Sequence, residues 1–469
     1  LGVLFALWSL GAIERLLTGT LPAGTVLTLD GLTLAFTIAL SAAAVLVIGL
    51  VPAWQASRVN LSEVLKDAAR GAPGGARGSR FRNFLITTEV ALSVALLIGS
   101  GLLLISFVKL QATPAGFNPR GIASAFVNLP AQRYATKGQQ ADFYYQVIEN
   151  LRANPQVKGA AAALSLPISG FGPRAVYAVE GRPIPPTSER AIASLNFVSD
   201  DYFSLLQIPL QSGRLFAATD REKSPGVCII NASFARRLFP DKPAVGQALL
   251  RGQNADIRLE IVGVVADVKS QGLNSPPPDT MYVPLQQWGG VGNTLVVSTS
   301  GDAAAMQSVL RASVAKVDKS LAISFFTTMD SALQQSLGIQ RITAWLTGVF
   351  AGVALVLSAV GLYSVLAYAV TQRTSEIGIR MALGADKGQV INLILSQGLR
   401  LVAIGLGIGL AVSAAGARLL ASLLYQIEPL DPVVFAGVAV LFSLVAVLAC
   451  LLPSLRASRI DPLVALRTE

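Results

Sequence analysis

The segment TSEIGIRMALGA, residues 374–385, separates two long apolar stretches and decides how the rest of the chain can be arranged. Residues 342–370 before it carry no charge, and residues 399–424 after it carry only two arginines. Each stretch is long enough to cross the hydrocarbon of a bilayer. The short segment between them is therefore expected to lie at one face of a membrane.

The order of residues within this segment predicts a short helix rather than a loose loop. Glu376 precedes Arg380 by four positions, the favourable order for a helical ion pair, and Gly384 is placed to end the helix. Four residues give it apolar faces: Ile377, Ile379, Met381 and Leu383. Two interpretations stay open on spacing alone. The helix is either a connector held against the lipid headgroups or a docking helix that receives force from a soluble partner.

Composition supports a membrane protein with several spans. The chain is 52% hydrophobic and only 14% charged, with a mean hydropathy of +0.57. Part of its net charge of +10 comes from a basic cluster between two apolar stretches: Arg58, Lys66, Arg70, Arg77, Arg80 and Arg82. This is the positive-inside pattern, which places that loop in the cytoplasm. No aromatic stripe accompanies the basic residues, so nucleic acid is not an expected partner.

Catalytic, cofactor and metal sites are not expected from the residues present. The chain has no histidine, which excludes a histidine base or ligand. It has no GxxxxGK[ST] segment for a nucleotide, so ATP is expected on a partner chain. The acids of the soluble part are scattered and are expected to be solvated or capping rather than catalytic: Asp200, Asp201, Asp267 and Asp279. The two cysteines, Cys228 and Cys450, are expected to be small buried hydrophobes.

The apolar stretches and the charged segments between them divide the chain into five parts. Residues 1–58 would hold the last two spans of a first membrane unit, and residues 59–83 a basic cytoplasmic linker rich in glycine. Residues 84–108 would be the first span of a second unit, followed by an extracytoplasmic domain at 109–338. Residues 339–469 would add three spans and a cytoplasmic tail. Since the linker is inside, the large domain is expected outside.

The large domain reads as an α+β fold. Two strand–helix–strand patterns flank a strand-rich insert, the first at residues 122–129, 137–154 and 157–167, the second at 294–300, 302–317 and 321–326. This arrangement predicts one domain built from the two ends of the segment, with a second lobe emerging from it.

An internal repeat links the two ends of the chain. Six residues of the first part recur at one constant displacement in the last part: Asp30, Pro52, Ala56, Ser57, Arg58 and Leu65 match Asp431, Pro453, Ala457, Ser458, Arg459 and Leu466. Duplication is the favoured explanation, and the alternative is that topology alone demands a span followed by a basic terminator. The chain opens inside an apolar run without Met, so a longer protein is expected, with the start of its first unit missing here.

Small residues in the spans predict close helix packing. Gly348 and Gly352 are four positions apart, as are Gly405 and Gly409, the small-xxx-small arrangement of packed membrane helices. The spans lack the paired charges that a polar conduit through the bilayer would need.

These features together resemble the FtsX-like and MacB-like permeases of ABC transporters. The resemblance lies in SEIGIRMALGA after a long span, the closing RASRIDPLVALRTE, and an outer domain inserted between the first and second of four spans. Phrases such as DYFSLLQIPLQSGRLF and EIVGVVADVKSQGL resemble the MacB-like periplasmic core domain. The repeat is similar to the duplicated orphan permeases called the ADOP type, although the first copy's opening span, outer domain and docking helix are absent from this chain.

The resemblance implies a multi-pass permease of the bacterial inner membrane with its large domain in the periplasm. A cytoplasmic ATPase subunit, with ATP and magnesium bound to it, would push on a docking helix and move the outer domain through rigid helices. Glu376, Gly378, Arg380 and Gly384 would form the docking turn. A periplasmic membrane-fusion protein and an outer-membrane channel are further expected partners.

A second class of function stays open. The chain could be a membrane sensor or regulator that transports nothing, whose outer domain binds a ligand or an envelope enzyme. The sequence does not reveal a transported substrate.

Overall fold

Residues 11, 30–57, 76–169, 172–372, 374–383 and 385–458 are described by the structure, a computed structural model. Within them the chain divides into two units, one formed by residues up to Lys109 and from Gln340 onward, the other by Leu110–Ile339. The corresponding bounds expected from the sequence are residues 109–338. Each unit is described by itself below.

Among the described residues of the helical unit, four helices are long and apolar enough to cross a membrane: α4 (Ala76–Gln111), α11 (Gly338–Gln372), α13 (Lys387–Leu420, extended by the 3-10 turn η3, Ala421–Leu423) and α14 (Pro432–Ala457). Helix α4 begins eight residues before the expected span, inside the predicted linker. Arginine favours helix, and basic side chains can continue a helix beyond the hydrocarbon. The rest of the predicted linker, residues 59–75, lies outside the described residues.

Helix α2 (Gly31–Ser57) covers the span expected at residues 31–51. The partial span expected at residues 1–13 lies outside the described residues except for Gly11. Both α2 and α14 begin directly after an aspartate of the repeat. Asp30 accepts from the Thr33 N–H at 2.9 Å, and Asp431 accepts from the Val433 N–H at 2.9 Å. The two helices thus share an N-terminal cap, while duplication of the whole unit stays a prediction.

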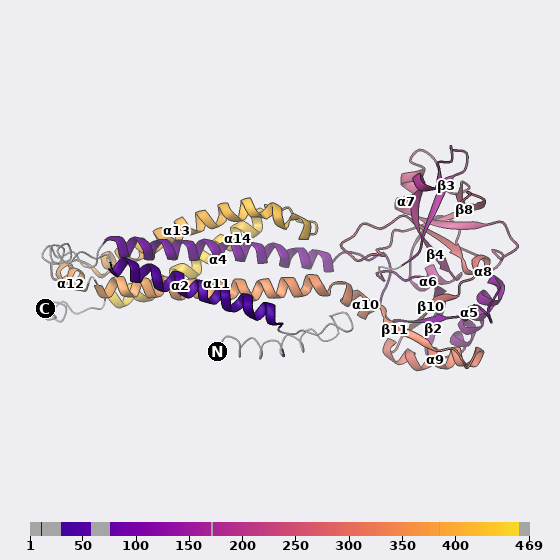
Figure 1. Cartoon of the computed structure of the whole chain (residues 1–469), viewed down its shortest axis with the longest axis horizontal. Helices are drawn as coiled ribbons and strands as arrows, with labels where there is room; N and C mark the ends of the chain where they lie inside the picture. Colours follow the sequence, from indigo (N-terminus) through magenta and orange to yellow (C-terminus); the bar gives the residue numbers. More distant parts are fainter. Residues whose placement is uncertain are drawn as a thin grey trace. The chain divides into compact units, whose positions relative to one another are not determined.

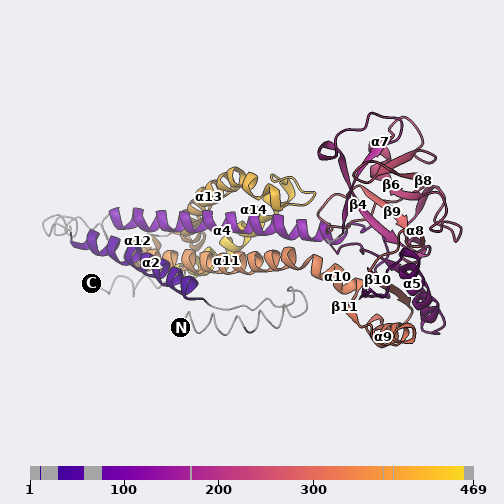
Figure 2. The ribbon, with the colours of Figure 1, turned by 45° about the vertical axis from the view of Figure 1, so that its right-hand side comes forward.

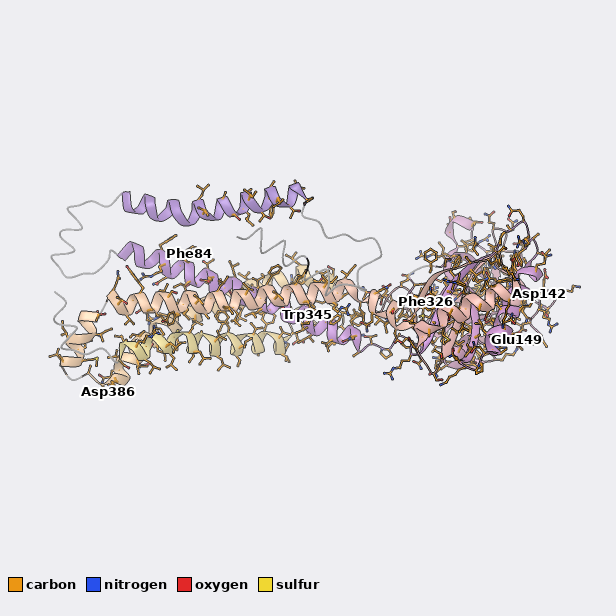
Figure 3. The ribbon with its side chains drawn as sticks, turned by 90° about the horizontal axis from the view of Figure 1, so that it is seen from below. Phe84, Asp142, Glu149, Phe326, Trp345 and Asp386 are labelled. Carbon is orange, nitrogen blue, oxygen red and sulfur yellow. The ribbon has the colours of Figure 1, made fainter. Side chains whose placement is uncertain are left out.

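The four long helices enclose one apolar core. Val94, Ile98 and Leu102 of α4 are fully buried within it, and α11, α13 and α14 supply the other walls. Large apolar side chains on the outer faces of the same helices are exposed, for example Trp345 on α11 (Figure 3). Apolar surface on both sides of a helix is the composition expected of a span that contacts lipid.

The first lobe of the outer unit is a four-stranded antiparallel sheet in the order β11-β1-β10-β2. Its strands are β1 (Ile122–Asn128), β2 (Val157–Ala163), β10 (Gly292–Thr299) and β11 (Ile323–Thr328). Helix α5 (Lys137–Arg152) connects β1 to β2, and α9 (Met306–Val317), after the turn η2 (Ala303–Ala305), connects β10 to β11. This is the split βαβ arrangement. The two predicted strand–helix–strand units are confirmed.

The second lobe is the predicted insert, folded as a closed ring of six strands in the order β4-β3-β7-β8-β6-β9, with β9 pairing back to β4. The strands are β3 (Arg174–Val179), β4 (Ala191–Val198), β6 (Val227–Asn231), β7 (Ala248–Arg251), β8 (Ile257–Val265) and β9 (Thr280–Pro284). The short strand β5 (Leu210–Gly213) pairs with β8, and α7 (Ala232–Leu238) and the turn η1 (Thr187–Glu189) complete the lobe. Cys228, Leu249, Leu259 and Ile261 are among its fully buried core residues.

The two lobes adjoin in one continuous sheet, and Figures 1 and 2 show α7 and β8 of the second lobe at the other end of the outer unit from α9 and β11 of the first. One residue pair, Ala163 with Val198, connects β2 to β4 in the sheet. The short helices α6 (Tyr202–Leu205) and α8 (Leu285–Trp288) lie at this junction. Lys137 of the first lobe and Arg251 of the second both lie over the ring of Trp288, at 4.6 and 4.8 Å from its centroid. Helix α10 (Met329–Ser336) follows β11 and leads to α11.

A buried hydroxyl in the first lobe tests this account of the fold. The Tyr144 hydroxyl donates to Val127 O at 3.0 Å and accepts from the Asn293 N–H at 3.0 Å, so it ties α5 to β1 and β10. Tyr144→Phe is expected to lower the free energy of unfolding by about 1–3 kcal/mol, because a buried N–H loses its acceptor. The loss of stability is measured as faster hydrogen exchange of the backbone amides of β1 and β10 in the detergent-solubilised chain.

Tyr134→Phe is the matched control. Its hydroxyl donates to Asp318, which Arg133 and Ser320 also bind, so the carboxylate keeps other donors. An equal loss in both variants would contradict the proposed role of Tyr144.

Candidate docking site

The segment on which the sequence argument depends is helical over Thr374–Ala382, here α12. Its last carbonyls are bound, since Leu383 N donates to Ile379 O at 3.0 Å and Ala385 N donates to Arg380 O at 2.9 Å. The second bond spans five positions, as in a Schellman C-terminus. Gly384, predicted to end the helix and to join the docking turn, lies outside the described residues.

One face of α12 packs against the helical unit. The Ile377 side chain is 4% exposed and belongs to the same core cluster as Val390 and Ile394 at the start of α13, with Met381 packed against that cluster. Gly378 is also buried. The expectation that Gly378 faces a partner is therefore wrong for this structure, because the residue lies on the inward side of the helix beside Ile377.

The opposite face of α12 carries an ion pair and two apolar side chains. Arg380 Nη2 lies 2.6 Å from Glu376 Oε1, and both side chains are about half-exposed. Ile379 is 46% exposed and Leu383 is 83% exposed. Positions 376, 379, 380 and 383 lie on one side of a helix, and we call these four residues the outward face of α12. The sequence argument missed Ile379 and Leu383 as docking candidates, although the helical spacing alone could have grouped them with the ion pair.

A shallow hollow with a cavity volume of about 20 Å³ lies beside this face. It is lined by Ala369 and Val370 of α11, by Glu376, Ile377 and Arg380 of α12, and by Leu393, Ile394 and Gln397 of α13. The walls are mainly apolar, and the ion pair contributes the charged part of the lining. The hollow is about the size of one water molecule, so a partner would contact the exposed side chains of the outward face rather than enter the hollow.

Neighbouring polar contacts hold the helix ends around α12 in place. Asp386 caps α13 by accepting from the Gly388 N–H, and Gln389 completes the capping box; Asp386 is labelled in Figure 3. The Arg82 guanidinium of α4 lies 4.8 Å from the centroid of the Tyr368 ring in α11. Arg456 of α14 donates to the hydroxyl of Tyr363 in α11. These contacts fix the positions of the helices that flank α12.

Two of the predicted packing glycines lie where α13 approaches α4. A Cβ on Gly405 would be 2.6 Å from Val90 Cγ1 and 2.9 Å from Thr87 O. A Cβ on Gly409 would be 2.8 Å from Ala91 O. Neither position has room for a side chain without displacing α4, because part of what it would meet is backbone.

The other predicted pair of packing glycines, Gly348 and Gly352, is less closely packed. Gly348 of α11 is in ordinary contact distance of Ser100 in α4, at 3.6 Å from a built Cβ. Gly352 has no described atom within 4 Å of that position, so the structure does not support its predicted packing role. Spacing identified the motif but not the side of α11 that faces a neighbour.

Polar groups contribute to the contact between α4 and α11. Ser93 Oγ and Ser358 Oγ are 2.7 Å apart, and Ser93 also donates to Ala354 O at 3.2 Å. The Glu89 carboxylate lies against Gly361, where a Cβ would be 2.8 Å from Oε2. The sequence analysis did not identify Gly361, and its role is visible only once the two helices are placed together.

The described residues form no group of His, Cys, Asp and Glu that could hold a metal ion. The four scattered acids of the outer unit have structural partners. Tyr145 donates to Asp200, Arg152 pairs with Asp201, Arg236 with Asp267, and Arg237 with Asp279. Burial raises the pKa of Asp200, and the Tyr145 hydroxyl counteracts part of that effect. Each of the four acids therefore has a structural partner in the outer unit.

Four candidate spans with a large α+β unit inserted between the first and second define a multi-pass membrane protein with one main domain outside the hydrocarbon. Two protein-family models match this chain: the MacB-like periplasmic core domain over residues 85–317 and the FtsX-like permease C-terminal domain over residues 348–462. The chain is an ABC transporter permease of this MacB-like and FtsX-like type, with a MacB-like periplasmic domain.

Curated relatives agree with this assignment. YknZ of Bacillus subtilis, described as an uncharacterized ABC transporter permease, is 28% identical over 357 residues, which cover 72% of this chain and 87% of YknZ. MacB of Marinobacter nauticus, a macrolide export ATP-binding/permease protein, is 27% identical over 286 residues. That match covers 59% of this chain and 44% of MacB, so the chain spans less than half the length of that relative.

Among solved structures, the periplasmic region of MacB from Actinobacillus actinomycetemcomitans matches with a TM-score of 0.33 and 15% identity, covering 48% of this chain and 96% of that region. The extracellular domain of YknZ matches with a TM-score of 0.28 and 18% identity, covering 42% of this chain and 91% of that domain.

The packing glycines allow a matched pair of substitutions. Gly409→Ala is expected to destabilise the helical unit by about 1–3 kcal/mol, because the added methyl meets the Ala91 carbonyl and Val94. Gly352→Ala adds the same methyl where no described atom lies within 4 Å, and is expected to be neutral or slightly stabilising because alanine favours helix. Thermal unfolding of both variants in the same detergent compares them. Equal stability of the two would show that α4 and α13 do not approach as closely as described.

Proposed function

We propose that this permease transmits ATP-driven motion from a cytoplasmic ATPase subunit to its periplasmic domain, in the service of efflux or envelope export. The ATPase, carrying ATP and magnesium, docks on the outward face of α12. The protein acts in the bacterial inner membrane, and a periplasmic membrane-fusion protein and an outer-membrane channel are further proposed partners. The word "export" in the description of the MacB relative supports this direction of transport.

The observation that carries the proposal is the division of α12 into two faces. Its inward face is fixed by the burial of Ile377, so a force on the helix is passed to the packed helices rather than lost in a loop. Its outward face leaves Leu383 almost fully exposed next to the ion pair of Glu376 and Arg380. An apolar anchor beside charged groups is typical of a protein interface.

Continuity of the chain supports the same role. Helix α11 runs without a break from Gly338, directly after the outer unit, to Gln372, two residues before α12 begins. A continuous hydrogen-bonded helix transmits axial displacement, whereas a flexible linker absorbs it. Ser93 and Ser358 bond α11 to α4, the other helix that leads into the outer unit. The two connections to the outer unit are thereby coupled to each other.

Substitutions on the outward face test docking. Arg380→Glu and Leu383→Asp are each expected to lower partner-stimulated ATPase activity at least tenfold, as loss of one interface anchor costs about 1.4 kcal/mol or more. Membrane insertion and thermal unfolding should stay unchanged for Leu383→Asp, since that side chain is 83% exposed. The measurement is ATP hydrolysis by the co-expressed ATPase, together with its copurification.

Two controls make the result specific. Leu383→Met keeps the apolar contact and should keep stimulation. The double variant Glu376→Arg with Arg380→Glu restores the intrahelical pair but reverses the charges that a partner meets, and should stay inactive. Normal stimulation in Arg380→Glu or Leu383→Asp would remove the docking assignment. Failure of any ATPase to copurify with the unmodified chain would favour the alternative sensor or regulator.

The proposed topology is tested by labelling. Asp142 is exposed on α5 of the outer unit (Figure 3), and Ile379 is half-exposed on α12. The native Cys228 and Cys450 are both buried, so background labelling should be low. In cells with a permeabilised outer membrane, an impermeant maleimide is expected to label Asp142→Cys and not Ile379→Cys. Labelling of both positions from the same side would contradict the scheme.

A further inference from the structure

A polar hollow lies where the two lobes of the outer unit meet, and nothing in the proposed function uses it. Its cavity volume is about 70 Å³. Ser165 follows β2 of the first lobe, whereas strands of the second lobe, the loop between β8 and β9, and Tyr202 of α6 supply other walls. We call it the junction hollow, and its polar and charged lining residues are Ser165, Arg174, Ser194, Asn196, Tyr202, Ser270, Gln271, Thr280 and Tyr282.

The floor of the junction hollow is set by strand register. Strands β4 and β9 run parallel, with Ser194 beside Thr280 and Asn196 beside Tyr282. Side chains alternate between the faces of a strand, so these two neighbouring pairs share one face of the sheet. Asn196, Thr280 and Tyr282 are all at least nine-tenths buried. The sheet thus presents four polar side chains at the bottom of the hollow.

Some of these groups are already satisfied and others are not. Asn196 accepts from the Ser165 N–H at 3.0 Å and donates to Ser165 O at 2.8 Å, which fixes its amide across the lobe junction. In the part of the chain that the structure describes, the hydroxyls of Ser194 and Tyr282 make no hydrogen bond to another residue, and neither oxygen is fully buried, so both are open to the hollow. The unused capacity of these two groups lies at the hollow.

The charged group in the lining of the hollow is Arg174, and the lining has no Asp or Glu. Three acids are next to lining residues in the sequence, and each pairs with an arginine: Asp201 with Arg152, Asp267 with Arg236, and Asp279 with Arg237. Burial and the nearby Asp267 raise the pKa of Tyr282, so its hydroxyl stays protonated as a donor. Hydroxyl donors together with an arginine are the groups that recognise carboxylate and phosphate oxygens.

We propose that the junction hollow is a binding site for a small solute that carries an oxyanion group, either a carboxylate or a phosphate. Tyr282 and Ser194 donate to its oxygens at the floor, and Arg174 supplies the positive charge. Residues of both lobes contact the solute, and only one residue pair joins the lobes in the sheet. Occupancy therefore stabilises one arrangement of the lobes over others, since a ligand favours the state that it binds best.

The test uses the whole chain in lipid nanodiscs, titrated by calorimetry with sodium acetate or with inorganic phosphate at matched ionic strength, with chloride as the baseline. Saturable binding of one anion is expected, and which anion binds distinguishes carboxylate from phosphate recognition. Tyr282→Phe and Ser194→Ala are each expected to weaken it about tenfold, because each removes one hydrogen bond to a charged group. Arg174→Gln should weaken it as well.

A control variant and a neutral solute distinguish binding at a specific site from general effects of charge and of added solute. Arg311→Gln removes an exposed arginine of α9, outside the lining, and should leave binding unchanged. Arg174 is exposed, so its variant is expected to fold even if a floor variant does not. The proposal is overturned if neither anion binds saturably, if the three lining variants bind as the unmodified chain does, or if sorbitol competes with the anion equally well. None of these outcomes depends on docking of an ATPase.

Discussion

The close approach of α4 to α13 is the contact on which the helical unit depends. Lipid tails are as apolar as leucine, so burial of apolar side chains gives little net drive for helices to associate within a bilayer, and packing at short range has to supply it. Gly405 and Gly409 allow α13 to approach α4 closely, since a methyl group at either position would overlap α4. The hydrogen bond between Ser93 and Ser358 joins α11 to α4 as well. Helix α12 rests on this assembly through Ile377, so its position is a consequence of packing elsewhere.

Much of the helical unit follows from composition, because long uncharged stretches in lipid leave helix as the available structure. The sequence could not say which side of each helix meets a neighbour. The apolar residues of a span surround the helix on all sides, so periodicity does not separate the core face from the lipid face. Gly352 and Gly409 occupy equivalent motif positions, yet Gly352 has no described neighbour and Gly409 is in contact with α4. Gly378 is a different case, because α12 is a short amphipathic helix and its spacing could have placed Gly378 on the inward side beside Ile377.

In the outer unit, local patterns predicted the elements and long-range pairing decided what they form. The two strand–helix–strand units were visible because each alternates between strand and helix periodicity within one local segment, Ile122–Ala163 and Gly292–Thr328. The six-stranded ring was not, since its closure depends on β4 pairing with β9, whose positions in the chain are far apart. The ion pair of Glu376 with Arg380 joins residues four positions apart and was predicted, whereas the polar floor of the junction hollow exists only because β4 and β9 meet in one register.

The side chains of the two candidate sites differ in what they contribute to stability and to function. On α12, the exposed side chains contribute little to folding, so they are free to serve a partner, and the buried side chains keep the helix in place. In the junction hollow, by contrast, the hydroxyls of Ser194 and Tyr282 make no hydrogen bond within the described residues and are open to solvent. The fold keeps polar side chains where its two lobes meet instead of filling the space with apolar ones. A bound oxyanion would replace solvent at these hydroxyls, and because it would contact residues of both lobes, it would favour one arrangement of the lobes over others.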